Sequence, residues 1–179
     1  MAEEKKEKWT TFLAISTILI AVCATLSTFK GGGFSTQSLL NQSKASDEWA
    51  HYQSKGIKGY LYELQKDKLQ LELDMINKEN LKPNVLEEYE TKIAYYSKSI
   101  KKYEEDKKEI SALAKSYEDQ RDENKAHSKA FGIAVIFLQV SILLSSISAL
   151  LKKKYIWFLS LAIAVVGIFY FVDGFLLFI

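Results

Sequence analysis

Three long apolar segments dominate the chain, and a long charged segment separates the first of them from the other two. The apolar segments cover residues 9–29, 130–151 and 155–179. The first two contain no charged residue, and the third contains only Asp173. Because about 20 consecutive apolar helical residues are needed to cross the hydrocarbon layer of a bilayer, the pattern predicts three transmembrane helices and excludes a soluble globular fold.

Short polar segments border these predicted spans. Residues 1–8 form a charged tail, and residues 152–154 are three lysines that leave room only for a tight turn between the second and third spans. The first span is followed by Lys30 and three glycines. Since glycine readily adopts the left-handed conformations that end helices, we expect the first helix to stop at residue 29 and a linker to occupy residues 30–43.

The segment 44–129 holds 17 basic and 18 acidic residues, and the chain's one proline, Pro83, lies near its middle. After this proline, apolar residues recur in alternating steps of three and four, which is the pattern of a helix with one buried seam. We therefore predict two helices that fold back antiparallel around a turn near residues 80–84. The predicted seam of the second helix includes Ile93, Tyr96, Ile100, Tyr103, Ile110 and Tyr117. In the first helix, the apolar residues that share one face are Trp49, Ile57, Tyr60, Leu64, Leu71 and Met75.

The fold class predicted from the whole pattern is all-α: three transmembrane helices, with an antiparallel helical hairpin, a coiled-coil stalk, between the first and the second. Tyrosine occupies several seam positions where leucine would pack more tightly. Its ring is apolar, but its hydroxyl must reach water or a partner. Two interpretations follow: a two-helix seam with hydroxyls at its edge, or a wider interface in which several hairpins assemble into a homo-oligomer.

The lysine clusters predict the orientation in the membrane. With three spans, Lys5, Lys6 and Lys8 lie on the same side as residues 152–154. Because lysine and arginine are enriched in cytoplasmic segments near membrane helices, we expect the N-terminus to be cytoplasmic and the hairpin extracytoplasmic.

Composition and motifs argue against several functions. Lysine and arginine total 24 against 22 acidic residues, so no excess of positive charge predicts binding to nucleic acid. We find no nucleophile with a suitably spaced base and no phosphate-binding loop, and we expect neither an enzyme nor a cofactor. His51 follows Asp47, and His127 follows Glu123, each by one helical turn. Such pairs arise by chance on charged helices, so we expect solvated positions and no metal site.

Four residues are candidates for polar contacts within the predicted spans. Gln139 lies near the middle of the second span, and a polar side chain at that depth usually faces other helices or water. Ser141 and Ser145 are small enough to let helices approach closely. Asp173 lies 18 residues beyond Tyr155, near the end of the third span. These residues are predicted either to join helices or to line a pore.

One stretch after the first span resembles the signature of a bacterial membrane family catalogued as domain of unknown function 4337. The residues that carry the resemblance are Asn41-Gln42, Ala45-Ser46-Asp47, Trp49-Ala50, Tyr52-Gln53, Lys55 and Ile57-Lys58. The similarity extends over nearly the whole chain and implies a multi-pass protein of the bacterial plasma membrane, with no assigned activity. The signature supplies a candidate assembly collar of Asp47, Trp49, Tyr52, Gln53, Lys55 and Lys58. Its residues are predicted either to fix the register of the hairpin or to bind a partner.

We expect an integral membrane scaffold that forms homo-oligomers through its hairpin and its spans, with the lipid bilayer as its other partner. The sequence identifies no protein partner. A second hypothesis is a channel or transporter subunit, in which one span from each copy lines a pore, because three spans alone cannot enclose a solute path. A third is a sensor that passes a signal along the hairpin to the bilayer.

Overall fold

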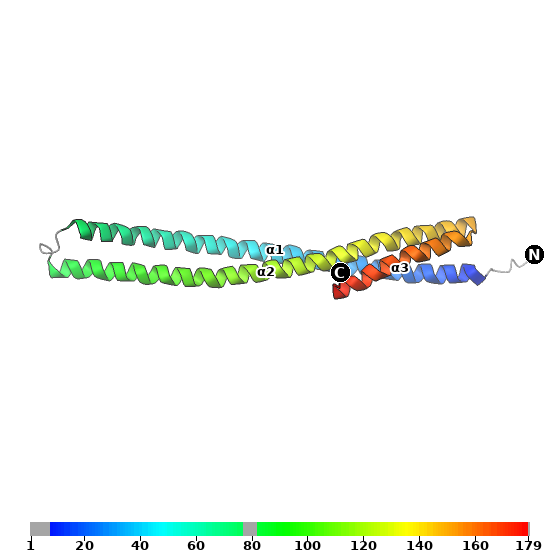
Figure 1. Cartoon of the computed structure of the whole chain (residues 1–179), viewed down its shortest axis with the longest axis horizontal. Helices are drawn as coiled ribbons and strands as arrows, with labels where there is room; N and C mark the ends of the chain where they lie inside the picture. Colours follow the sequence, from blue (N-terminus) through cyan, green and yellow to red (C-terminus); the bar gives the residue numbers. More distant parts are fainter. Residues whose placement is uncertain (1–7, 77–81, 179) are drawn as a thin grey trace, which may run out of the picture. The chain divides into compact units, whose positions relative to one another are not determined.

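The computed structural model describes residues 8–76 and 82–178, which form three helices (Figure 1). Helix α1 spans Lys8–Met75, α2 spans Pro83–Leu151 and α3 spans Lys154–Leu176. The all-α prediction is confirmed: no strand occurs in the described residues. The predictions for residues 1–7, for residues 80 and 81 of the turn and for residue 179 lie outside these ranges.

Helix α1 is continuous through its three glycines. The prediction that the first helix ends at residue 29 and that residues 30–43 form a linker is therefore wrong. None of the described glycines has a positive φ. A Cβ atom at Gly31 would lie 3.0 Å from Cβ of Phe131, and the Ser128 hydroxyl donates a hydrogen bond to the Gly31 carbonyl at 3.0 Å. Gly31 thus allows α2 to approach closely, and this packing offsets the low helix propensity of glycine.

Helix α2 begins at Pro83, where proline's fixed φ and missing N–H suit the first turn of a helix. The backbone N–H groups of Val85 and Leu86 donate to the Lys82 carbonyl. No proline interrupts the helix after this point, and α2 runs unbroken from the charged segment through the apolar one to Leu151.

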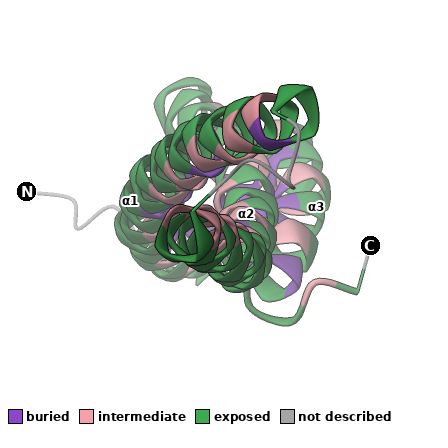
Figure 2. Ribbon diagram, turned by 90° about the vertical axis from the view of Figure 1, so that its left-hand side faces the viewer, coloured by how far each residue is buried: buried purple, intermediate pink, exposed green. Residues whose placement is uncertain are grey.

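The chain divides into two compact units, one of residues 1–40 with 120–179 and the other of residues 41–119. The first unit contains the apolar parts of all three helices together with the charged segment 120–129 of α2, and the second contains most of the charged parts of α1 and α2. In both, exposed residues cover most of the ribbon and buried residues form narrow bands (Figure 2).

In the first unit, small residues of α3 form its contact face. Ser160, Ala164 and Gly167 are buried there, together with Asp173 and Gly174. A Cβ atom at Gly167 would lie only 2.8 Å from Leu138 of α2. Small residues at such positions let helix backbones approach closely, and interhelical packing is a main source of association when lipid is the solvent.

The second unit is an antiparallel pair of helices, here named the helix pair: α1 from residue 41 to 75 and α2 from residue 83 to 119. Three contacts give its direction. Lys44 lies over the ring of Tyr117, Lys55 pairs with Asp106, and Tyr89 hydrogen-bonds to Glu72. Residue numbers therefore fall along α2 as they rise along α1.

Candidate assembly surface

Within the helix pair, α1 turns its smallest residues toward α2. Gly56 and Gly59 are both buried. A Cβ atom at residue 59 would lie 3.7 Å from Cβ of Tyr103, and one at residue 56 would lie 4.0 Å from Cε of Lys107. Glycine permits this approach because it has no side chain. The two glycines therefore make room for large side chains of α2.

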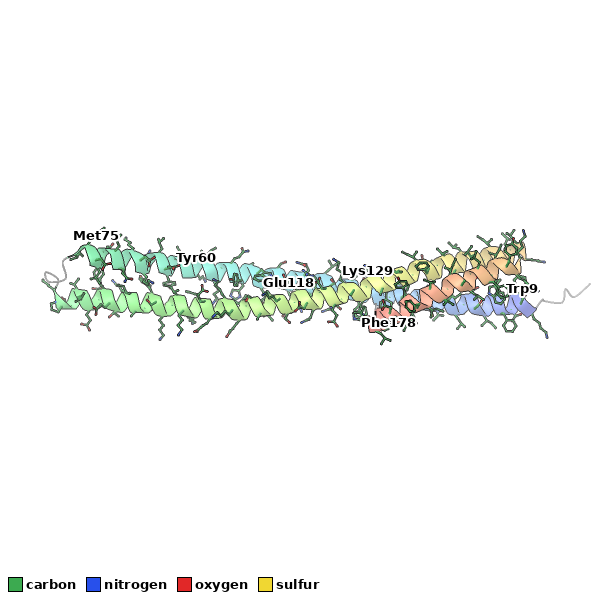
Figure 3. The ribbon with its side chains drawn as sticks, viewed as in Figure 1. Trp9, Tyr60, Met75, Glu118, Lys129 and Phe178 are labelled. Carbon is green, nitrogen blue, oxygen red and sulfur yellow. The ribbon has the colours of Figure 1, made fainter. Side chains whose placement is uncertain are left out.

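Six large apolar residues in this part of α1 lie on its opposite face. Their exposed fractions range from 57% for Leu71 to 75% for Met75, so more than half of each side chain is accessible. We name this set the outer stripe: Ile57, Tyr60, Leu61, Leu64, Leu71 and Met75. Of these, Tyr60 and Met75 are labelled in Figure 3. Ile57, Tyr60, Leu64, Leu71 and Met75 share one face, as the sequence predicts, but this face is exposed, because α2 packs against the glycine face instead.

The predicted seam of α2 is partly buried at all six positions: Ile93, Tyr96, Ile100, Tyr103, Ile110 and Tyr117. Tyr62 of α1 lies against it, with its ring centroid 5.6 Å from those of Tyr96 and Tyr103. A hydrogen bond with Tyr95 is the main cause that raises the pKa of the Tyr62 hydroxyl. Sequence analysis missed Tyr62, although its spacing from Gly59 and Lys66 continues one helical face.

Three of the six collar residues contact α2. The indole N–H of Trp49 donates to Glu118 at 2.9 Å. Lys107 lies 5.2 Å from the ring centroid of Tyr52, and Lys55 pairs with Asp106. The other three collar residues are exposed: Asp47, Gln53 and Lys58. The contacting residues can fix the register of the helices, and the exposed ones are accessible to a partner.

Lys107 interrupts the apolar seam without burying an isolated charge. Its ammonium group lies 2.9 Å from the Glu104 carboxylate, and its side chain is 14% exposed. The hydrogen bond to Glu104 raises the pKa of Lys107. The aliphatic stem can therefore pack in the seam while the charged end keeps a partner.

Lys55 and Asp106 form the shortest described ion pair between α1 and α2. The Lys55 ammonium donates to the Asp106 carboxylate at 2.7 Å and lies 5.5 Å from the ring centroid of Tyr103. The hydrogen bond from Lys55 holds the pKa of Asp106 below its ordinary value of 3.8. A carboxylate whose pKa is lowered by folding stabilises the fold only while it is ionised.

Acid should therefore loosen the helix pair. The contribution of Asp106 is fully present above its ordinary pKa of 3.8 and is lost as the pH falls through the lower pKa of the folded state. We expect Asp106→Asn to reduce the loss of thermal stability between about pH 5 and pH 2, measured by circular dichroism on the full chain in detergent. Asp74→Asn, at an exposed position of α1, is the control. If Asp106→Asn loses as much thermal stability on acidification as the unaltered protein, the ion pair between Lys55 and Asp106 does not stabilise the fold.

Asn41 is the one buried amide with no hydrogen bond in the described part of the chain. The residue is 1% exposed, and neither its side-chain nitrogen nor its oxygen has a partner there. Leaving a buried polar group unpaired costs about 1–3 kcal/mol. Asn41→Leu is thus expected to raise the free energy of unfolding by roughly 1 kcal/mol or more, measured by chemical denaturation. Gln37→Leu, at an exposed position, is the control. Destabilisation by Asn41→Leu would show that the amide is needed.

Two grooves lie along the helix pair. One, of about 430 Å³, is lined by Lys55, Tyr62, Tyr95, Lys98, Ser99, Lys102, Tyr103 and Asp106. Its three lysines outnumber its single carboxylate, so its lining is positively charged. The other, of about 360 Å³, adjoins one end of the outer stripe and is lined by Tyr52, Gln53, Gly56, Ile57, Tyr60 and Lys107.

The two histidines are not gathered with other metal ligands. His51 lies 3.8 Å from Glu48, and Nδ1 of His127 lies 2.9 Å from the carbonyl oxygen of Gly174. Across residues 8–76 and 82–178, no group of three or more His, Cys, Asp or Glu side chains is arranged to hold a metal ion.

In the first unit, two candidate serines join α2 to α3. Ser141 and Ser145 are fully buried. The Ser141 hydroxyl donates to the Ser160 carbonyl at 2.8 Å, and the hydroxyls of Ser145 and Ser160 lie 2.9 Å apart. Gln139, by contrast, is exposed on α2. The structure therefore brings the serines together with α3 but leaves Gln139 on the surface of the unit.

Asp173 lies at the C-terminal end of α3 and is 4% exposed. Its carboxylate accepts the backbone N–H of Phe178 at 2.9 Å, and its carbonyl accepts that of Leu177 at 2.8 Å. Asp173 thus satisfies backbone donors where the helix ends.

Together these features define an all-helical protein in which each of the three helices contains a segment long and apolar enough to cross a membrane. The model of the family described as Domain of unknown function (DUF4337) matches residues 9–177, and the chain belongs to that family. No curated protein and no solved structure matches the chain.

Proposed function

We propose that this protein is a membrane-anchored helical scaffold that assembles with further copies of itself through the outer stripe. The observation that carries the proposal is the exposure of six large apolar side chains on one face of α1. Contiguous apolar surface rimmed by polar residues marks interaction sites. With Lys68 between Leu64 and Leu71, the stripe contains a run of positions in steps of three and four, which suits packing against another helix.

The first unit supports the membrane anchor. Trp9 and Trp157 lie with their ring centroids 6.4 Å apart, and Lys154 lies 5.8 Å from the Trp9 ring. Lys153 lies at the same distance from Tyr155. Aromatic and lysine side chains gather in this way at membrane–water interfaces. In the proposed topology this end of the unit faces the cytoplasm, and the helix pair is extracytoplasmic.

The alternative is a channel subunit with one span per copy lining a pore. Gln139 is exposed and could face such a path. Ser141 and Ser145 favour the scaffold, because both are occupied by contacts with Ser160. Ion flux into proteoliposomes that is lost in Gln139→Leu would support the channel instead.

Replacing three leucines of the outer stripe tests the scaffold. Burying a leucine fully contributes about 1.5–3 kcal/mol, and Leu61, Leu64 and Leu71 are each more than half exposed, so each could add about 1 kcal/mol to association. Because both copies carry the change, we expect the triple substitution by glutamine to weaken self-association at least about 100-fold, measured by dilution of the full chain in lipid with fluorescence energy transfer.

Leu113→Gln is the matched control, since Leu113 of α2 is 43% exposed but lies outside the outer stripe. This variant should associate as the unaltered protein does. If the triple variant associates as strongly as the unaltered protein, the proposal loses its support.

A further inference from the structure

We infer that two copies of this chain pair antiparallel along the outer stripe, with Met75 of each copy seated in the groove beside Ile57 of the other. The inference rests on the proposed self-association and adds the direction and the register of the pair. Three features of the helix pair carry it: the groove, the spacing of the stripe and the charges along its edge.

The groove and Met75 lie at opposite ends of the outer stripe. The groove of about 360 Å³ is lined by Tyr52, Gly56, Ile57 and Tyr60, among others, while Met75 is the most exposed member of the stripe at 75%. An antiparallel pair brings each Met75 to the other copy's groove. Methionine is flexible and makes favourable sulfur contacts with aromatic rings such as those of Tyr52 and Tyr60. A parallel pair would instead set groove against groove and Met75 against Met75.

The spacing of the stripe is compatible with this register. Positions 57, 61, 64, 68, 71 and 75 follow alternating steps of four and three, as core positions of paired helices do. With Ile57 opposite Met75 of the second copy, Leu61 lies opposite Leu71. Leu64 then lies opposite Lys68, whose apolar stem can cover the leucine while its ammonium reaches solvent. Each of these three contacts between the copies occurs twice, because the pair has twofold symmetry.

The charges beside the stripe also favour the antiparallel direction. In this register Lys58 lies beside Glu72 of the second copy, and the symmetry repeats this attractive pair. Glu72 already approaches Lys68 and Tyr89 in its own chain at 3.9 and 3.3 Å, but a carboxylate can accept several hydrogen bonds. A parallel pair would place Asp67 beside Glu72 of the second copy twice, which is repulsive.

One contact opposes the antiparallel pair. Asp67 approaches Asp67 of the second copy near the symmetry axis. This repulsion occurs once, and the carboxylate lies 3.9 Å from Lys66 in its own chain. Lys68 of the second copy also lies near the symmetry axis, where its positive charge reduces the repulsion between the two Asp67 carboxylates. The antiparallel pair therefore has two attractive charge pairs and one partly screened repulsion, whereas the parallel pair has two repulsions. The charges favour the antiparallel direction.

Spin labels on the full chain in lipid distinguish the two directions. The labels are placed at residues 51, 58 and 65, one at a time, with Cys23→Ser removing the native thiol. All three positions are exposed and lie on one side of the stripe. In the antiparallel register the symmetry axis passes at residue 66, so the two labels of a pair are offset along the helix axis by about 3, 24 and 45 Å at residues 65, 58 and 51, at 1.5 Å per residue.

The expected result is a distance between labels that is shortest at residue 65 and longest at residue 51. Equal distances at all three positions would overturn the antiparallel pair but leave the proposed self-association standing. An absence of any interchain distance, together with unchanged association in the Leu61, Leu64 and Leu71 variant, would overturn both. Met75→Gln gives an independent readout: it should weaken association several-fold, whereas Leu113→Gln should not.

Discussion

Valine in place of Gly167 is expected to separate α3 from α2. A single Cβ atom at this position would lie 2.8 Å from Cγ and Cδ2 of Leu138 and 3.1 Å from its backbone nitrogen. Leu138 is fully buried, so its side chain has little room to move. Overpacking of this kind typically costs about 1–3 kcal/mol, and the nearby backbone of α2 puts Gly167→Val at the upper end or beyond.

The effect can be measured by hydrogen exchange on the full chain in lipid, where the amides of α3 should lose protection. Gly132→Val is the matched control, because a Cβ atom at Gly132 would meet nothing within 4 Å. Both variants place valine in a helix, so they share the change in helix propensity. If the two variants show the same protection, close packing at Gly167 is not needed to hold α3.

Phe131→Ala is expected to be the most destabilising truncation in the first unit. Phe131 is fully buried, and its ring centroid lies 4.9 Å from that of Phe175 and 5.9 Å from that of Phe34. Gly174 leaves space for this ring, since a Cβ atom there would lie 2.8 Å from its Cδ1 and Cε1 atoms, and Gly31 leaves space for the Cβ atom of Phe131. Removing the ring leaves a cavity that the glycines cannot fill.

Phenylalanine-to-alanine changes in protein cores cost about 3–5 kcal/mol, and we expect Phe131→Ala to reach that range if the surrounding helices do not collapse. Thermal unfolding in detergent should show a clearly lowered midpoint. Phe12→Ala, at a residue that is 61% exposed, should have a small effect. Similar midpoints for the two variants would show that Phe131 is not a packing centre.

The arrangement of apolar and charged residues was sufficient to predict an all-helical chain and three long apolar helices. The break at Pro83 separated the two long helices in the prediction, but α2 begins at Pro83 itself, inside the predicted turn of residues 80–84, because proline is well accommodated at the first helical position. The continuity of α1 could not be predicted from local propensity. Gly31 allows a close approach to Phe131, and that tertiary contact outweighs glycine's tendency to end a helix.

Within the helix pair, the apolar face that packs against the other helix was predicted correctly only on α2. The seam residues from Ile93 to Tyr117 are large and follow one pattern, so their inward face could be predicted. On α1 the rule that large apolar residues point inward failed, because the inward positions include Gly56 and Gly59. A signal was present: buried positions at Ile20, Ala24 and Ser27 keep steps of three and four that continue through Gly31 to the helix pair. The large apolar residues of α1 therefore indicated the exposed face, whereas the small residues at this spacing mark the face that packs against α2.

The most direct test of the central claim compares the accessibility of Leu64 and Leu113 in the full chain, assembled in a bilayer, by hydroxyl-radical footprinting. In a single copy Leu64 is the more exposed of the two, at 66% against 43%. Self-association through the outer stripe predicts the reverse order, with Leu64 protected and Leu113 reactive. Greater reactivity at Leu64 than at Leu113 in the assembled protein would contradict the account.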